Sequence, residues 1–202
     1  MPHTTVSPED TKDLKRAQTA HPVHPLIRDR FSARAFAAEP FTHEVVLTLL
    51  EAAAWAPSSM NEQPWRYRYA LRGTPAFDRL WECLKPGNQP WTREAAALVV
   101  CSGIKVLARD GSPNTAWAHD VGLSNANLLT QAVSMGIYGH LMGGIERAKA
   151  EELLGIDPTR EGIVCFLALG YLGTADQLGE PFRTRELTPR TRQPLTELVT
   201  AL

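Results

Sequence analysis

Cysteine is scarce in this chain of 202 residues, and the spacing of the cysteines excludes some classes of site. Cys83, Cys101 and Cys165 are widely separated, and no Cys-x-x-Cys pair is present. An odd number of cysteines at such spacing argues against a disulfide framework and against a zinc cluster. Cys101 and Cys165 lie in apolar, strand-like runs, so we interpret them as buried small hydrophobic residues.

Several catalytic motifs are also missing. The six histidines show no metal-ligand spacing, and the chain has no His-Glu-x-x-His motif, no P-loop and no Gly-x-Ser-x-Gly elbow. His119 and Asp120 are adjacent on a predicted helix, where neighbouring positions do not face each other. We therefore interpret them as a surface or capping pair, predict no metal site and assign no catalytic acid or base.

The charge and the hydropathy of the chain limit the classes of partner that it can bind. The net charge is −1, so no basic field favours nucleic acid. No apolar run approaches the roughly 20 residues of a membrane span. The first 20 residues are polar and lack the apolar core of a signal peptide, so we expect a cytoplasmic protein without membrane contact. A hydrophobic fraction of 44% and a charged fraction of 21% fit one globular domain with a substantial core.

Hydrophobic periodicity predicts both helices and strands. The expected helices span residues 45–55 with Thr42 as N-cap, 75–83, 114–135 and 146–154, and Gly136 and Gly155 end the last two. The expected strands span residues 65–71, 96–102 and 163–169. Ser124, Asn125 and Asn127 interrupt the apolar face of the longest helix. They would be awkward in the core of a monomer and could pair at a helix–helix dimer seam.

The segment from Ala56 to Trp65 places small hydroxyls, two carboxamides and two prolines between a predicted helix and a predicted strand. Pro57 must end the helix, because proline lacks an N–H group and clashes with the preceding turn. Pro64 favours an extended Gln63. Polar loops on a rigid scaffold are common binding sites. The alternative is an ordinary helix exit in which serine and asparagine serve as turn formers.

A second segment, Arg30-Phe31-Ser32-Ala33-Arg34-Ala35-Phe36, comes about one helix length earlier. Together with Pro57-Ser58-Ser59-Met60-Asn61-Glu62-Gln63-Pro64-Trp65, it resembles the nitroreductase family of FMN-dependent oxidoreductases. The resemblance implies an α+β, nitroreductase-like fold with a central, mainly antiparallel sheet flanked by helices. It also implies a homodimer whose C-terminal segments are exchanged between subunits. The FMN-binding domain would span residues 24–202, after a flexible or partner-clasping arm at residues 1–23.

The resemblance also implies roles for individual residues. Arg30 and Ser32 would bind the FMN phosphate with Arg190 and Arg192, which are otherwise typical solvated charges. Arg34 would face the flavin N1/O2 edge, where a cation stabilises the anionic reduced ring. Phe31 stands where relatives often carry a basic or polar residue. The loop residues Pro57, Ser58, Ser59, Asn61 and Gln63 would contact the FMN of the neighbouring subunit.

Two further segments complete the implied site. Asn88 would meet the flavin pyrimidine, and Trp91 stands where some relatives carry a lysine. Residues 140–145 would form the loop under flavin N5, with cofactor contacts from Leu141, Met142, Gly143 and Gly144. Leu141 and Gly143 replace a proline and a glutamate of several relatives, but a backbone N–H of Gly143 or Gly144 can still reach N5. Without the resemblance, this segment is a simple turn between helices.

The activity implied is electron transfer from NADH or NADPH, through FMN, to a small acceptor such as a nitroaromatic or a quinone, by a ping-pong mechanism. Members of the same family also reduce enoyl bonds, remove halogens from aromatic rings or break down flavin. Two other hypotheses stay open at this stage. The chain could bind FMN as a non-catalytic sensor, or it could be an interaction domain without flavin.

Overall fold

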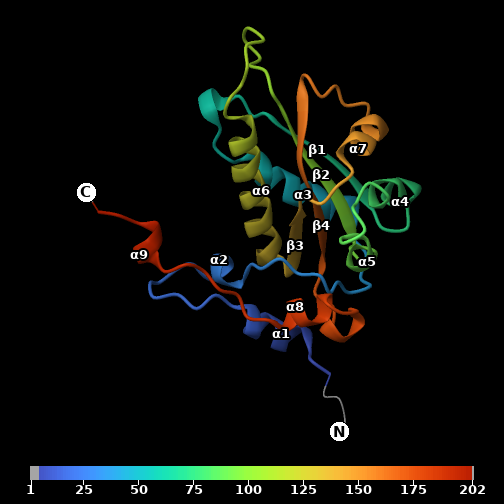
Figure 1. Cartoon of the computed structure of the whole chain (residues 1–202), viewed down its shortest axis with the longest axis vertical. Coiled ribbons are helices and arrows are strands. Elements are labelled where there is room, and N and C mark those ends of the chain that lie inside the picture. The colour runs from blue at the N-terminus through green and yellow to red at the C-terminus, as the bar shows by residue number, and fades with distance from the viewer. Residues whose placement is uncertain (1–4, 202) are drawn as a thin grey trace.

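The centre of the computed structural model, which describes residues 5–201, is a four-stranded sheet of order β1-β2-β4-β3 (Figure 1). All neighbouring strands pair antiparallel. The strands are β1 (Trp65–Leu71), β2 (Ala97–Ile104), β3 (Ile137–Met142) and β4 (Glu161–Tyr171). The expected α+β architecture with a mainly antiparallel sheet is confirmed, as are three of the four strands.

Helices surround this sheet. They are α1 (Pro8–Lys15), α2 (Pro25–Asp29), α3 (His43–Ala54), α4 (Pro75–Trp81), α5 (Gln89–Thr92), α6 (Trp117–Ser134), α7 (Arg147–Leu154), α8 (Phe182–Leu187) and α9 (Leu195–Leu198), with 3-10 turns η1 (Ser59–Asn61) and η2 (Ala175–Gln177). No helix within residues 5–201 is both long enough and apolar enough to cross a membrane.

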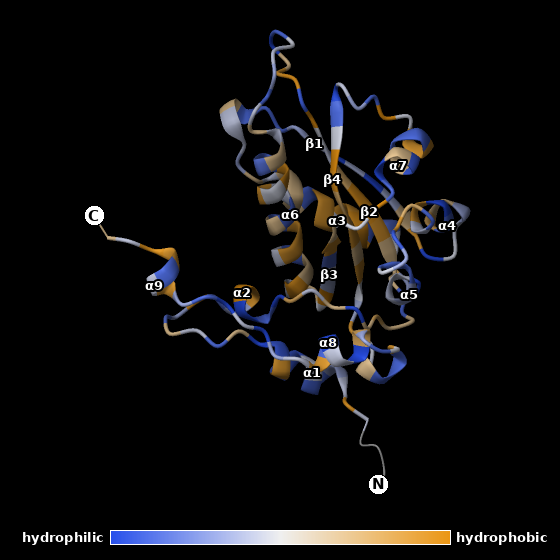
Figure 2. Cartoon of the chain, viewed as in Figure 1, coloured by the Kyte–Doolittle hydropathy of each residue, from blue (hydrophilic) through white to orange (hydrophobic). Residues whose placement is uncertain are grey.

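The core consists of two apolar layers, one on each face of the sheet. Leu98 and Val100 of β2 pack into the layer that α4, α5 and α7 cover, whereas Val99 and Cys101 pack into the layer of α3 and α6. Successive strand residues point to opposite faces, so burial on both faces makes β2 continuously apolar. Figure 2 shows this apolar character along the central strands. Cys101 and Cys165 are both buried and unpaired by disulfide, as predicted.

Local sequence signals fix the helix ends. The Thr42 hydroxyl accepts a hydrogen bond from the Val45 N–H at 3.4 Å at the start of α3, as the sequence predicted. Gly136 and Gly155 follow α6 and α7 with φ of 71° and 62°. That left-handed conformation costs glycine little, which explains why both helices end there.

Strand β3 was not predicted, and residues 140–142 were expected in a loop. They instead form the end of β3, where His140, Leu141 and Met142 pair with Ala168, Leu167 and Phe166 of β4. Gly139 interrupts the β-forming pattern of this short segment. A larger residue there would force the neighbouring side chains to move, because a Cβ at this position would lie 2.4 Å from Leu129 Cδ2 of α6.

Gly139→Ala is therefore expected to lower the free energy of unfolding by about 2 kcal/mol, the usual cost of overpacking a well-packed core. The new methyl group would also meet leucine side chains of β4 at 3.0 Å, so it has no open direction. Urea denaturation of this variant and of Gly87→Ala, where a Cβ meets nothing within 4 Å, measures the effect. Equal stability of the two variants would contradict the close approach of α6 to β3.

The polar residues of α6 are satisfied within the chain, so they do not require a dimer seam. The Ser124 hydroxyl donates to the carbonyl oxygen of Ala53 at 2.8 Å. The Tyr67 hydroxyl lies 2.8 Å from Ser124 Oγ and donates to Asn125 Oδ1 at 2.9 Å. Asn127 Nδ2 donates to a carbonyl at the end of α3. The sequence pattern could not reveal these partners, because they lie 57 to 75 residues away.

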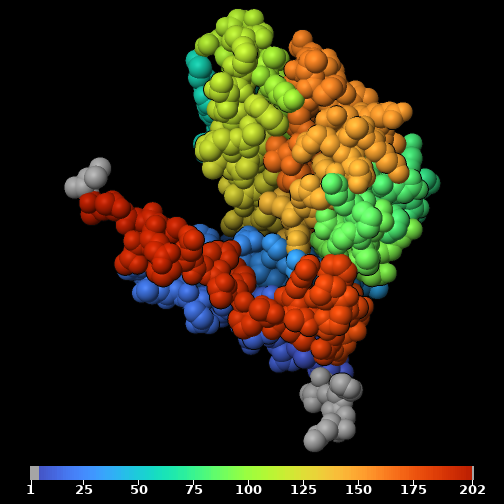
Figure 3. Space-filling view, viewed as in Figure 1, coloured from blue at the N-terminus to red at the C-terminus, as the bar shows by residue number. Residues whose placement is uncertain are grey.

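Helix α1 near the N-terminus and helix α8 near the C-terminus lie side by side (Figure 1). Residues of α1, within the predicted N-terminal arm, contact α8 of the same chain. Buried Lys15 joins them by donating to the carbonyl oxygens of Arg185 and Thr188. Beyond α8 the tail leaves the body of the molecule and runs over the N-terminal segment, as Figure 3 shows in red over blue. Its large apolar residues, Leu195, Leu198 and Val199, are exposed.

Candidate functional site

A cationic pocket of about 220 Å³ lies where the N-terminal segment, the 30–34 segment and the C-terminal tail meet. We call it the Arg30 pocket, and its lining residues are Lys15, Arg30, Phe31, Ser32, Arg190 and Arg192. Five of these six residues were predicted to be cofactor ligands. The structure therefore brings the Arg-x-Ser motif and the late arginine pair together, although about 160 residues separate them.

The charges in this pocket are unbalanced. Four of its six lining residues are cationic, and none is a carboxylate. Burial, and then the nearby Arg192, lower the pKa of Arg30. The pKa of Arg190 is lowered by burial and by both of these arginines. The guanidinium of Arg30 has no hydrogen-bond partner within residues 5–201. A bound anion would relieve the repulsion and give the free guanidinium an acceptor.

Arg190 is held in place by the backbone. Its guanidinium donates to the carbonyl oxygens of Lys15, Arg28 and Arg30. The interpretation of Arg190 as a solvated charge is therefore wrong for this residue, whereas Arg192 is exposed. Three of the five Arg190 N–H groups are used in these bonds, so its main contribution is to anchor the tail beside the pocket.

Glu186 and Lys15 support the pocket, and no local sequence pattern identified either residue. Glu186 of α8 is completely buried and accepts hydrogen bonds from the backbone N–H groups of Arg34 and Ala35. Burial raises the pKa of this carboxyl, and the two N–H groups oppose that effect. Because Glu186 lies more than 150 residues from these partners, no local pattern identifies it.

A second cluster continues from the Arg30 pocket along the 30–34 segment. The Arg34 guanidinium carbon lies 5.8 Å from the centre of the Trp91 ring, which lies 4.5 Å from the His140 ring centre. Asn88 Nδ2 donates to the Gly144 carbonyl oxygen at 2.9 Å. A Cβ at Gly144 would lie 2.8 Å from that same nitrogen, so the contact requires glycine. Arg34 thus lies beside Trp91, which contacts His140, and Asn88, three residues before Trp91, is bonded to Gly144; we call these five residues the Arg34 cluster.

His140 is uncharged at neutral pH in this cluster. Burial lowers its pKa to about 4, and the charge of Arg34 acts in the same direction. Its Nδ1 lies 3.1 Å from the Ala33 carbonyl oxygen, which can only accept, so the proton is on Nδ1. A neutral ring avoids placing a second cation beside the half-buried Arg34.

The lowered pKa predicts an acid-sensitive fold. A histidine that is harder to protonate in the folded state contributes stability above its unfolded pKa of about 6.5 and loses it as the pH falls towards about 4. At pH 5 the loss is about 2 kcal/mol. Urea denaturation at pH 7 and pH 5 is expected to show a smaller loss for His140→Asn than for the unmodified chain. The control His21→Asn changes an exposed histidine, and an equal loss in all three proteins would contradict the assignment.

The loop after α3 is strained. Met60, Asn61 and Gln63 have φ of 52°, 57° and 46°. Asparagine tolerates this left-handed region, but methionine and glutamine adopt it at a cost. The expectation of an extended Gln63 is therefore wrong. The Gln63 N–H bonds to Ser58 Oγ at 3.0 Å, and the tight turn that this bond closes overrides the preference imposed by Pro64. Such strain is concentrated at functional sites in proteins.

Asp120 of α6 holds this loop. Its side chain is only 2% exposed, and Oδ2 accepts from the Ser59 N–H at 3.0 Å. The other oxygen, Oδ1, lies 3.0 Å from His119 Nδ1. The adjacent side chains do contact each other, contrary to the argument from helix geometry, because the exposed imidazole folds back toward the carboxylate. Asp120 is thus a positioning residue that the sequence analysis missed.

The predicted site residues fall into two groups within one chain. Residues 57–63 precede β1 beside the end where Trp65 pairs with Gly103, whereas Phe36 pairs with Leu172 at the other end of the sheet, toward the Arg30 pocket. Figure 1 shows the two groups at opposite ends of the molecule. At the end of β3, Leu141 is 39% exposed and Met142 only 2%, and Gly143 follows them in the connection to α7.

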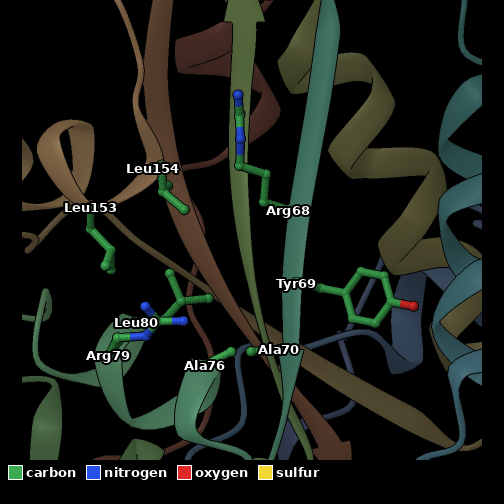
Figure 4. Close-up of a pocket in the computed structure, with 8 residues that line it drawn as sticks. All are labelled: Arg68, Tyr69, Ala70, Ala76, Arg79, Leu80, Leu153 and Leu154. Atoms are coloured by element: carbon green, nitrogen blue, oxygen red, sulfur yellow. The ribbon is translucent and has the colours of Figure 1, made fainter.

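A smaller hollow of about 110 Å³ lies between β1, α4 and α7. Figure 4 shows its lining, in which Leu80, Leu153 and Leu154 provide apolar walls. Arg68 also lines it, but its guanidinium is already paired with Glu161 and Ser102. None of the predicted site residues reaches this hollow, and we assign it no role.

Comparisons with known proteins identify relatives of this chain. A protein 34% identical over 153 residues, covering 72% of this chain and 83% of its own, is the "Putative NADH dehydrogenase/NAD(P)H nitroreductase" of Archaeoglobus fulgidus. The nitrobenzene nitroreductase of Ectopseudomonas oleovorans is 50% identical over 48 residues, which are 24% of this chain and 21% of that protein.

Solved structures share the fold. A crystal structure described as an oxidoreductase containing FMN has a TM-score of 0.85 and 34% identity, and the match covers 91% of this chain and 93% of that one. An FMN complex from Desulfovibrio desulfuricans, described as a putative nitroreductase, has a TM-score of 0.72 and 26% identity, with 91% and 98% covered. The model of the nitroreductase family matches residues 27–82 and 72–171. The chain therefore belongs to the nitroreductase family.

Proposed function

We propose that this protein is an FMN-dependent oxidoreductase that takes electrons from NADH or NADPH and passes them to a small acceptor, such as a nitroaromatic or a quinone. The observation that carries the proposal is the Arg30 pocket, whose lining has four cations and no carboxylate and which the 30–34 segment connects to the Arg34 cluster. FMN has a phosphate at one end, which matches the Arg30 pocket, and a flat ring at the other end, which matches the Arg34 cluster.

The Arg30 pocket fits the FMN phosphate chemically. A phosphate monoester carries close to two negative charges and three acceptor oxygens near neutral pH. Arg30 offers a guanidinium without a hydrogen-bond partner among residues 5–201, and Ser32 and Lys15 line the same pocket. Arg190 and Arg192 add positive charge, and Arg190 also fixes the tail. The relatives that contain FMN support this assignment by similarity.

The Arg34 cluster fits the flavin ring. Arg34 brings a cation, Trp91 and His140 bring aromatic surface, and Asn88 keeps its Oδ1 available to accept from a ring N–H group after Nδ2 has bonded to Gly144. A backbone N–H of Gly143 or Gly144 would face flavin N5 without needing a side chain. The neutral His140 adds no charge that would oppose Arg34.

Bound FMN would supply the redox chemistry by accepting a hydride from the nicotinamide and passing electrons on. The protein's own residues bind the phosphate, orient the ring and keep a positive charge beside it. Donor and acceptor would occupy the same open face in turn, which is a ping-pong mechanism. No residue is assigned as a general acid or base.

The site would be completed in a homodimer. Within one chain, the strained loop of residues 57–63 lies at the end of the sheet opposite the Arg30 pocket (Figure 1), so it would contact the flavin of the partner. Exposed apolar side chains accompany that loop: Trp55 is 80% exposed, and Leu47 and Met60 are also exposed. Exposed apolar groups of this kind are typical of protein interfaces.

An anaerobic visible spectrum tests the function directly. Purified protein, saturated with FMN, is recorded before and after addition of NADH, and separately of NADPH. Loss of the flavin bands with either nucleotide is the expected result, and re-oxidation by a nitroaromatic or a quinone identifies the class of acceptor. FMN that binds but stays oxidised would favour a non-catalytic sensor, and a protein that cannot bind FMN would refute the proposal.

A further inference from the structure

A second pocket, of about 480 Å³, lies at the other end of the sheet from the Arg30 pocket. We call it the Asn114 pocket. Its apolar lining is Pro64, Ile104, Val106, Leu107, Ala108 and Gly111, and its polar lining is Glu62, Arg66, Asn114 and Arg160. A volume in this range, apolar walls and a few convergent polar groups are typical of small-molecule sites. None of the predicted FMN ligands lines it.

Asn114, which lines this pocket, has a side-chain hydrogen-bond donor without a partner among residues 5–201. The residue is 4% exposed, and its Oδ1 accepts from the Ala116 N–H at 3.1 Å. That N–H group requires an acceptor, which fixes the orientation of the amide and makes the remaining atom an NH2 group. Nδ2 is buried and has no hydrogen-bond partner within residues 5–201. A buried donor left unpaired costs about 1–3 kcal/mol, so an acceptor at this point would be stabilising.

The charged residues around Asn114 favour an anionic acceptor. Arg160 is exposed, and its guanidinium has no partner among the described residues. Arg66 donates to the carbonyl oxygens of Gln63 and Trp65 through Nη1, which leaves its other N–H groups free. Glu62 also lines the pocket, but one of its carboxylate oxygens accepts from the Ala108 N–H at 3.0 Å. The pocket lining therefore contains two arginines and one carboxylate, which is already hydrogen-bonded.

The loop that closes the pocket is ordered by the same residues. The Asn114 N–H donates to the Lys105 carbonyl oxygen at 2.7 Å, and Val106 pairs with Pro113. Glu62 joins this hairpin to the strained loop of residues 57–63. The hairpin thus contributes much of the apolar wall, and Asn114 and the two arginines add hydrogen-bond donors to the lining. This arrangement suits a molecule with an apolar body and a terminal anionic group.

We infer that the Asn114 pocket binds a small organic anion, an apolar molecule with a terminal carboxylate or phosphate, whose oxygens accept from Asn114 Nδ2 and from the guanidinium groups of Arg66 and Arg160. This site is separate from the FMN phosphate site. Its occupancy does not depend on the redox activity proposed above.

Calorimetric titration of the FMN-saturated protein tests this inference, because FMN then occupies the Arg30 pocket. The probes are benzoate, phenyl phosphate and the neutral benzamide. Benzoate or phenyl phosphate is expected to bind, and benzamide to bind at least about tenfold more weakly, as expected when charged hydrogen bonds are lost. The better of the two anions identifies the terminal group. Equal binding of benzamide, or no binding of either anion, would overturn the inference.

Variants of the pocket residues then show whether the anion binds in the Asn114 pocket. Asn114→Asp keeps the acceptor for Ala116 and replaces the NH2 group with a charged oxygen, so it is expected to weaken anion binding at least about tenfold. Arg160→Ala changes an exposed side chain and is expected to weaken binding about threefold. Arg79→Ala, an exposed arginine on α4, is the control and should leave binding unchanged. Unchanged binding in both Asn114→Asp and Arg160→Ala would overturn the site.

Discussion

Replacing Arg30 with alanine is expected to weaken FMN binding about 100-fold and to leave the folded chain at least as stable as before. A hydrogen bond to a charged group contributes about 1.5–3 kcal/mol, and a loss of 2.7 kcal/mol corresponds to 100-fold. The Arg30 guanidinium has no protein partner within residues 5–201, so its removal breaks no bond inside the chain. It also relieves the repulsion from Arg192 and Arg190 that lowers the arginine pKa values in this pocket.

The comparison of FMN with riboflavin makes this experiment specific, because riboflavin has the same ring without the phosphate. Fluorescence titration of the unmodified chain, Arg30→Ala and the control Arg79→Ala gives the affinities for both flavins. Arg30→Ala should lose FMN affinity and keep riboflavin affinity, and Arg79→Ala should change neither. If Arg30→Ala loses both flavins equally, the residue supports the ring site instead. If it loses neither, the phosphate lies elsewhere.

The elements that the sequence predicted well are those with local signals. Alternation of residues identified β1, a continuous apolar run identified β2 and β4, and Thr42, Gly136 and Gly155 identified helix ends. Strand β3 was missed because Gly139 breaks its pattern, and the reason for that glycine is the leucine packed against it from α6. Close packing between distant elements leaves no trace in a short window of sequence.

The site residues, too, divide into those with a local sequence signal and those that depend on contacts between distant parts of the chain. The Arg-x-Ser-x-Arg segment is contiguous, so its residues could be proposed together, and the structure places Arg30 and Ser32 on one pocket and Arg34 beside the next cluster. Lys15, Glu186 and Asp120 support the site through bonds to residues 61 to 173 positions away. No spacing rule reports such contacts. Arg190 could be included only through the family resemblance, and its hydrogen bonds to three carbonyls became visible only in the fold.

Replacing Leu195, Leu198 and Val199 together with serine is expected to weaken a dimer about 10⁴-fold. The three side chains are more than half exposed in the single chain, and burying the rest of their surface on a partner would contribute about 1 kcal/mol each. A symmetric dimer contains two such tails, so about 6 kcal/mol is lost in total. The triple variant should also bind FMN more weakly, because in the monomer the loop of residues 57–63 would no longer reach the flavin of the partner.

Sedimentation with and without FMN measures both effects, since the chain has a mass of 22.3 kDa and a dimer twice that. The matched control replaces Thr196 and Thr200 with serine, which changes the same tail without removing large apolar groups. An unmodified chain that sediments as a monomer with FMN bound would refute the shared site. A triple-serine variant that stays dimeric with full FMN affinity would remove the tail from the interface. Loss of the dimer with unchanged FMN affinity would show that the strained loop serves another purpose. The expected result is that the triple variant loses both the dimer and its FMN affinity, while the control loses neither. Only that result requires that the tail hold two chains together so that each chain completes the flavin site of the other.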